Sequence, residues 1–86
     1  MDKIKVYDEI GQEVEKEVIL LFELNEKSYV LFRDIEGTNK KIYASYFYAD
    51  ETDNDVINLH NDLTEDEYYM LEKIYKEGRD LHDRKN

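Results

Sequence analysis

The residue types that perform nucleophilic catalysis are scarce in this sequence. It contains no cysteine, its only serines are Ser28 and Ser45, and its only histidines are His60 and His82. Nucleophilic catalysis needs a base within hydrogen-bond reach of an activated hydroxyl or thiol. A contact between Ser45 and His60 stays open from the sequence, but no local catalytic motif accompanies either residue. We therefore expect no catalytic residues and a protein that is not an enzyme.

The acidic run at 50–55, Asp-Glu-Thr-Asp-Asn-Asp, has the composition of a cation-binding loop. Oxygen ligands at alternate positions of a flexible loop suit a hard cation such as Ca²⁺. An EF-hand loop starting at Asp50 needs a glycine and a glutamate where this chain has Asp55 and Asn61. A loop starting at Asp53 has an isoleucine at a ligand position. We therefore predict a solvated turn and no metal site, with weak, nonspecific cation binding as the alternative.

Neither the glycines nor the carboxylates of the sequence indicate a cofactor or acid–base site. A phosphate-binding loop needs clustered glycines, whereas the three glycines here, Gly11, Gly37 and Gly78, stand far apart. Because the chain has 22 acidic residues, pairs of neighbouring carboxylates arise by chance and do not indicate a catalytic pair. Acid–base catalysis by such a pair also needs a dry cleft, for which a chain of 86 residues has little room. We expect no cofactor.

The net charge of −10 is concentrated in one segment. Residues 50–67 hold 8 of the 22 acidic residues and no lysine or arginine. Direct binding to nucleic acid or to an anionic membrane surface requires clustered basic residues, so we expect neither. A partner protein with a basic surface is electrostatically favoured. The alternative is that the acidic surface only keeps a small protein soluble and monomeric.

Length and hydropathy indicate one cytoplasmic domain. A chain of 86 residues accommodates a single domain, and we expect residues 1–86 to form one, with an ordered core at about 3–77. The N-terminal residues lack the apolar run of a secretory signal. The longest apolar run, residues 18–22, is much shorter than the roughly 18 residues of a membrane span.

Alternating apolar residues predict a sheet in the first two thirds of the chain. Turn signals at Gly11, Asn25 and Gly37 separate the runs. Strands are expected at 3–7, 14–24, 28–32 and 41–48, with a short fifth at 56–59. In the second strand, alternation puts Val18, Leu20, Phe22 and Leu24 on one face and Ile19 and Leu21 on the other.

A terminal helix is predicted after residue 64. Thr64 is a favoured N-cap and Glu67, three residues later, completes a capping box. An apolar stripe follows, formed by Leu71, Ile74 and Tyr75. Gly78 is expected to end the helix, leaving 79–86 as a frayed tail. Short turns between the strands favour a meander, so the predicted fold class is α+β: a four- or five-stranded antiparallel sheet with one C-terminal helix packed on one face.

Three segments together resemble a known family. They are residues 4–14, 22–32 and 42–48, and it is their order and spacing that carry the resemblance. The sequence resembles "domain of unknown function 1292", a family of small acidic proteins from low-GC Gram-positive bacteria and their wall-less relatives, over about residues 3–77. Ile10 departs from the usually polar first turn, and Tyr68 or Tyr69 stands where many members carry tryptophan. The resemblance implies a bacterial, cytoplasmic protein and no known activity, cofactor or catalytic residue.

Two features of the sequence suggest a binding surface. The predicted strands are apolar on both faces, and one helix covers only part of one face, so the other face could be an interface. A sheet that coils and buries both faces against itself is the alternative. The second feature is Tyr69 on the polar side of the helix, where its ring could contact a partner or lie over lysine stems. The candidate partner surface comprises Ile19, Leu21, Val30, Phe32, Tyr43, Phe47, Tyr69, Asp50, Glu51, Asp53 and Asp55.

These observations lead to one functional hypothesis and three alternatives. We expect a non-catalytic, acidic protein-binding or regulatory module that is a monomer or a weak homodimer. One alternative is a nucleic-acid mimic, whose carboxylates occupy the DNA or RNA site of another protein. The others are a small enzyme or ligand binder, which needs a concave pocket with converging polar groups, and a homodimer formed through the uncovered sheet face.

Overall fold

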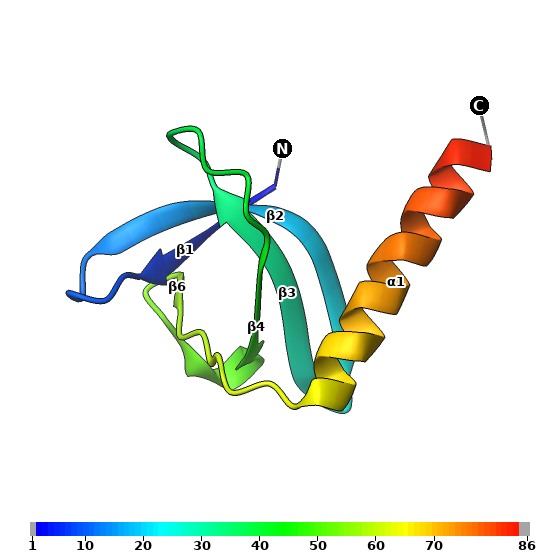
Figure 1. Cartoon of the computed structure of the whole chain (residues 1–86). Coiled ribbons are helices and arrows are strands. Elements are labelled where there is room, and N and C mark those ends of the chain that lie inside the picture. Colours follow the sequence, from blue (N-terminus) through cyan, green and yellow to red (C-terminus); the bar gives the residue numbers. More distant parts are fainter. Residues whose placement is uncertain (1, 85–86) are drawn as a thin grey trace.

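The computed structural model describes residues 2–84, and for residues 53 and 79–84 only the backbone. Within this part, the chain forms a curled sheet and one long helix that projects from it (Figure 1). This confirms the predicted α+β class. The elements are β1 (Lys3–Tyr7), β2 (Glu13–Leu24), β3 (Lys27–Asp34), β4 (Tyr43–Tyr48), the 3₁₀ turn η1 (Ala49–Glu51), β5 (Thr52–Asp53), β6 (Val56–Ile57) and α1 (Glu65–Arg84).

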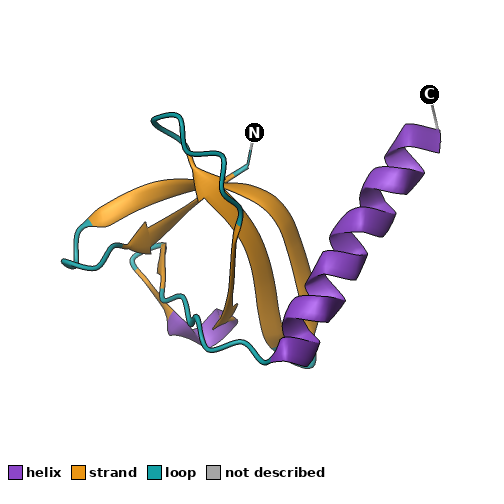
Figure 2. Ribbon diagram, in the orientation of Figure 1, coloured by secondary structure: helices purple, strands orange, loops and turns teal. Residues whose placement is uncertain are grey.

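The sheet has the strand order β4-β3-β2-β1-β6-β5. Strands β1 to β4 form the predicted antiparallel meander, whereas β6 pairs with β1 in parallel. The chain after β6 then crosses to the opposite edge, where His60 and Tyr46 exchange two backbone hydrogen bonds of 2.8 and 3.0 Å. This bridge draws β4 towards β1 and gives the sheet the curled, partly closed form seen in Figure 2.

Two hairpins depend on tight two-residue turns. Asn25 and Glu26 join β2 to β3, and Asn54 and Asp55 join β5 to β6. All four residues have positive φ, between 49° and 69°. Such turns match the right-handed twist of the paired strands, and asparagine tolerates the left-handed region better than most residues. The polar dipeptides therefore fix where each hairpin reverses.

A bulge in β2 changes which residues share a face. Val18 pairs with Phe32 but Leu20 pairs with Leu31, so Ile19 is an extra residue in the ladder. A one-residue bulge shifts the side-chain alternation of the strand that carries it. The prediction that Val18 lies on the same face as Leu20 is therefore wrong, and so is the prediction that Ile19 lies opposite Leu20. Ile19 and Leu20 both pack on the helix side of the sheet.

Strand β3 is buried on both faces. On the helix face, defined by Tyr29 and Leu31, the side chains pack with Leu71 of α1, which is 1% exposed. On the inner face of the curl, Val30 is fully buried and Phe32 is 8% exposed. β3 is thus an interior strand, paired with β2 on one side and β4 on the other, and its burial on both faces explains its uninterrupted apolar run.

Helix α1 begins as predicted but ends later. The Thr64 hydroxyl accepts a hydrogen bond from the Glu67 N–H, and the Glu67 carboxylate accepts one from the Thr64 N–H, which confirms the capping box. The helix continues through Gly78 to Arg84, so the prediction that it stops at Gly78 is wrong. A helix interior tolerates glycine at a cost of about 1 kcal/mol relative to alanine. No helix within residues 2–84 has the length and apolar content of a membrane span.

Candidate functional site

The apolar part of the predicted partner surface is largely inaccessible. Val30 and Phe32 are buried inside the curl, so the proposed uncovered sheet face does not exist at β3. For these two residues the alternative holds, because the coiled sheet buries the inner face against itself. Tyr43 and Phe47 lie half-buried on the same inner face, opposite Phe32 and Ser28.

The remaining predicted residues are spread over three regions. Leu21 is 58% exposed near one end of the inner face, while the bulge turns Ile19 to the helix face. Tyr69 is 71% exposed on α1 beside Glu72 and Lys76. The other members lie at the end of the sheet that carries η1, namely Asp50, Glu51 and Asp55; the side chain of Asp53 lies outside the described residues.

The structure brings two of the predicted acidic residues together with two unpredicted ones. Asp50 and Glu51 of η1 face Glu23 and Glu26 of the β2–β3 hairpin across an open hollow of about 550 Å³. Tyr48 and Ser28 complete its wall. We call this site the acidic hollow. It combines four carboxylates with one aromatic ring, groups that together suit a guanidinium or ammonium group.

The acidic hollow keeps most of its negative charge because three of its four carboxylates have no basic partner among the described residues. Glu51 lies 2.8 Å from His60 Nε2, while Glu23, Glu26 and Asp50 have no ion pair among the residues that the structure describes. Lys27, which directly follows the hairpin turn, donates to Glu67 Oε2 at 3.2 Å. Its ammonium also lies 4.2 Å from the Tyr46 ring centroid. Lys27 is thus directed to the helix face.

A hydrogen-bonded junction around Glu67 holds the hairpin against the helix. The Glu67 carboxylate accepts from the Tyr29 hydroxyl, from the Thr64 N–H and from Lys27. These bonds, the Tyr29 bond first, lower the pKa of Glu67 from 4.5 to about 2. The same bond to Glu67 raises the pKa of Tyr29. Because Lys27 and Tyr29 begin β3, this junction fixes the position of the β2–β3 hairpin and of its two glutamates.

Like charges around the acidic hollow should oppose folding at low ionic strength. Salt screens repulsion between exposed carboxylates. We expect moderate salt to raise the melting temperature by about 2–6 °C, which corresponds to somewhat less than 1 kcal/mol for a domain of this size. Differential scanning calorimetry across a series of NaCl concentrations measures this shift. A melting temperature that falls steadily over that series contradicts the expectation.

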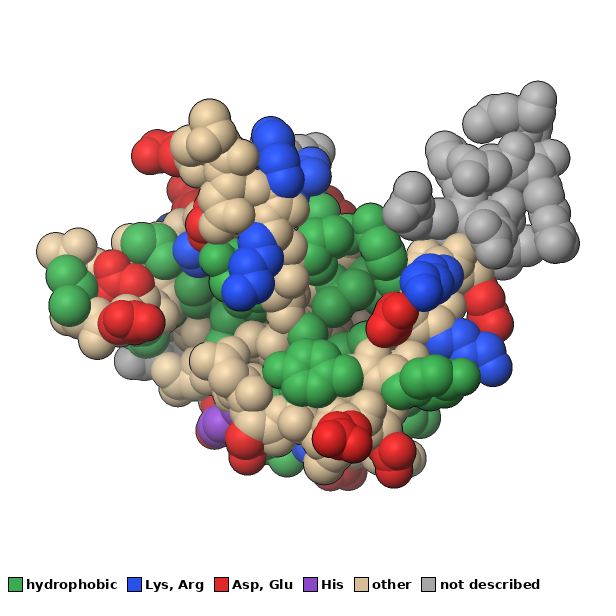
Figure 3. Space-filling view, viewed as in Figure 1, with side chains coloured by type: hydrophobic (Ala, Val, Ile, Leu, Met, Phe, Trp, Pro, Cys, Tyr) green, Lys and Arg blue, Asp and Glu red, His purple; other side chains and the backbone are tan. Residues whose placement is uncertain are grey.

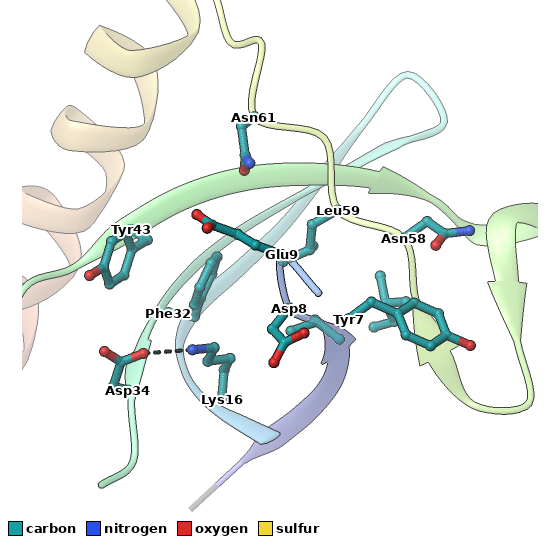
Figure 4. Close-up of a pocket in the computed structure, with 12 residues that line it drawn as sticks. Tyr7, Asp8, Glu9, Lys16, Phe32, Asp34, Tyr43, Asn58, Leu59 and Asn61 are labelled. Carbon is teal, nitrogen blue, oxygen red and sulfur yellow. Dashed lines mark hydrogen bonds and ion pairs between the residues drawn. The ribbon is translucent and has the colours of Figure 1, made fainter. Parts of the chain in front are cut away.

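A second hollow opens at the opposite end of β3. We call it the mouth hollow; its volume is about 410 Å³ and it is shown in Figure 4. Its floor is apolar, with Phe32 stacked on Tyr43 at a centroid distance of 5.6 Å. In Figure 4, Glu9 extends over the hollow, whereas Tyr7 points away from it. The predicted residues Phe32 and Tyr43 thus meet here and not on a flat sheet face.

An ion pair lines the mouth hollow. Lys16 Nζ lies 2.6 Å from Asp34 Oδ1 and lowers the pKa of that carboxyl. Asn39 donates to both Asp34 and the Tyr43 hydroxyl, at 3.3 and 3.1 Å. The residues that line this hollow include no serine, threonine or histidine. The site therefore offers a polar rim over an apolar floor.

The serine and histidine flagged in the sequence have structural contacts. The Ser45 hydroxyl donates to Asn61 at 2.6 Å, and the Ser45 residue is 1% exposed. The His60 ring stacks on Tyr46 with centroids 5.0 Å apart, and its Nε2 faces Glu51. Both residues help to close the sheet. Within the described residues, no group of three or more His, Cys, Asp or Glu side chains could hold a metal ion.

Sequence reasoning missed Glu23 and Glu26 because they lie outside the acidic segment. The sequence feature that could have located them is the dipeptide Asn25-Glu26. It forms a two-residue turn, so Glu23 and Glu26 lie together at one hairpin tip. The sequence alone gives no register between that tip and η1, so it could not place Asp50 opposite them. In comparisons with known proteins, no family model, curated protein or solved structure matches this chain.

Proposed function

We propose that this protein is a non-catalytic module that binds a basic segment of another protein in the acidic hollow. The observation that carries the proposal is the convergence of Glu23, Glu26, Asp50 and Glu51 on one open concavity beside Tyr48. Four carboxylates around one concavity give it a negative potential, which favours a bound ammonium or guanidinium group. Opposite charge also speeds the encounter between partners.

We propose the bacterial cytoplasm as the setting of the module, because the family that its sequence resembles implies that compartment. The excess negative charge of each copy opposes tight self-association, in line with a monomer or weak homodimer. On the face that Figure 3 shows, the acidic side chains lie in separate groups and not along the one elongated ridge that nucleic-acid mimicry needs.

Neutralising the acidic hollow should abolish most of the affinity for a basic peptide. The probe is a fluorescent peptide of alternating valine and lysine, and binding is followed by anisotropy. In the triple variant Glu23→Gln, Glu26→Gln, Asp50→Asn, three favourable charge interactions are lost. Each is worth about 0.2–1 kcal/mol, so we expect the dissociation constant to rise roughly tenfold.

A matched control separates this site from the overall charge. The triple variant Glu36→Gln, Glu65→Gln, Glu77→Gln makes the same change in net charge at exposed positions that do not line the acidic hollow. It should raise the dissociation constant no more than about twofold. Equal losses in the two triple variants would show that net charge alone attracts the peptide, and the proposal would fail.

The mouth hollow favours a second candidate function, the binding of a small ligand. An apolar floor beneath a rim of convergent polar groups is typical of ligand sites, and about 410 Å³ lies within their usual range. Screening of fragments by protein-observed NMR tests this candidate. Ligands of this site should shift the resonances of Phe32 and Tyr43 and leave those of Tyr69 unchanged. A screen without such shifts removes the candidate.

A further inference from the structure

The second half of β2 has an open edge. Strand β1 pairs only with residues Glu13 to Glu17 of β2, and the last contact on that side is the bond from the Val18 N–H to the Asp2 carbonyl, at 2.8 Å. From residue 19 to residue 24, β2 pairs with β3 alone. No other backbone hydrogen bond reaches this stretch from the residues that the structure describes. Residues 19–24 of β2 thus have β3 on one side and no strand on the other side among the described residues.

The register fixes which backbone groups face outward. The two-residue turn puts Leu24 and Lys27 in a hydrogen-bonded pair, and the pairing type alternates along an antiparallel ladder. Glu23 and Leu21 therefore direct their N–H and C=O groups away from β3. Unpaired groups of this kind on a strand edge form a template for another strand.

The open edge carries only part of the usual protection against strand addition. Natural edges carry lysine, proline, bulges or inward-pointing charges; here the bulge at Ile19 and the charge of Glu23 flank residues 20–22, which read Leu-Leu-Phe. Leu21 is 58% exposed and Leu24 is 42% exposed. The edge is thus both unpaired and apolar, a combination typical of strand-addition sites.

The charges along the edge indicate what kind of strand fits. Glu23 belongs both to the open edge and to the acidic hollow, where Glu26 and Asp50 are its neighbours. Side chains alternate between the two faces of an added strand. One set would lie beside Leu21 and Glu23 on the inner face, where a lysine stem can cover Leu21, and the other beside Phe22 and Leu24 on the helix face. The first set should be basic and the second apolar.

A second copy of this chain fits the edge poorly. Antiparallel pairing of residues 19–24 with themselves would place Glu15 of each copy near the Glu23 and Glu26 end of the other, whereas Glu17 is already paired with Arg33. Like charges that approach across a sheet are destabilising, and each copy carries a net charge of −10. Charge complementarity therefore favours a segment of another protein.

We propose that an extended segment of alternating basic and apolar residues, from a partner protein, adds to the sheet at residues 19–24 of β2. Its basic side chains enter the acidic hollow and its apolar side chains pack on Phe22 and Leu24. This inference rests on the proposed function, since it names the form in which the basic partner is bound. The backbone supplies affinity, and the alternating side chains supply specificity.

Backbone methylation of the probe peptide tests strand addition. We assign the peptide an antiparallel register with lysines opposite Leu21 and Glu23, so that the lysine amides face β2 and the valine amides face solvent. N-methylation of the lysine amides should weaken binding about tenfold or more, because several hydrogen bonds of about 1 kcal/mol each are lost. N-methylation of the valine amides is the matched control, and it should change the dissociation constant less than about threefold.

Amide hydrogen exchange gives a second readout on the protein. On peptide binding, exchange at the amides of Leu21 and Glu23 should slow about tenfold or more, while the amide of Phe22, already directed to β3, should change little. Equal affinities of the two methylated peptides, together with unchanged exchange at Leu21 and Glu23, would overturn strand addition and leave the acidic hollow as the site. Failure of the unmodified peptide to bind would overturn the proposed function as well. Slower exchange at higher protein concentration without peptide would assign the edge to a second copy.

Discussion

Truncation of Leu71 to alanine is expected to lower the free energy of unfolding by about 2–5 kcal/mol. Leu71 is the residue of α1 that is buried to 1% exposure, and it packs against Tyr29, Leu31 and Tyr46 on the helix face of the sheet. Its removal leaves a cavity at the centre of the only cluster that joins helix to sheet within the described residues. Urea titration followed by circular dichroism measures the loss.

The same helix supplies a matched control for this variant. Tyr69→Ala removes a larger side chain, but Tyr69 is 71% exposed. We expect it to change the free energy of unfolding by no more than about 0.5 kcal/mol. Equal losses in the two variants would mean that Leu71 does not anchor the helix, and the account of the core would be wrong.

Acid should destabilise the protein through Glu67. Its pKa is lowered from 4.5 to about 2 in the folded state by the Tyr29 hydroxyl, the Thr64 N–H and Lys27. A carboxylate with a lowered pKa contributes stability above its unfolded pKa and loses it as the pH falls through its folded pKa. The contribution of Glu67 is therefore complete at pH 7 and declines between about pH 5 and pH 2. We expect it to be about 1–3 kcal/mol.

The variant Glu67→Gln isolates this contribution. It should be less stable than the wild type at pH 7, and the difference in free energy of unfolding should shrink towards pH 2, where Glu67 of the wild type also becomes neutral. Glu65→Gln, an exposed change in the same helical turn, is the control and should give a small difference throughout. A deficit of Glu67→Gln that stays constant from pH 7 to pH 2 contradicts the role of its charge.

Local patterns were sufficient for the four main strands and for the start of the helix. Thr64 and Glu67 predict the start of α1, because a capping box is formed by residues within four positions of one another. The alternation of apolar residues places the four main strands, and the turn at Asn25 places the hairpin. The end of α1 was not predictable from Gly78, because glycine is a weak signal that the rest of a helix can override.

Only the tertiary structure decided which residues share a surface. The bulge at Ile19 exchanges the faces of β2, and a bulge depends on how two strands pair, which a single strand does not encode. Closure of the sheet by His60 buries Val30 and Phe32, removing the flat apolar face that alternation suggested.

The sequence by itself determined the four main strands and the start of the helix, because each depends on residues close together in the chain. The structure determined that Glu23 and Glu26 meet Asp50 and Glu51, and that residues 19–24 have no second neighbour. The first feature brings together segments at least 24 residues apart. The second depends on where the neighbouring strand β1 ends. Such contacts follow from strand pairing and curl, which local propensity does not specify.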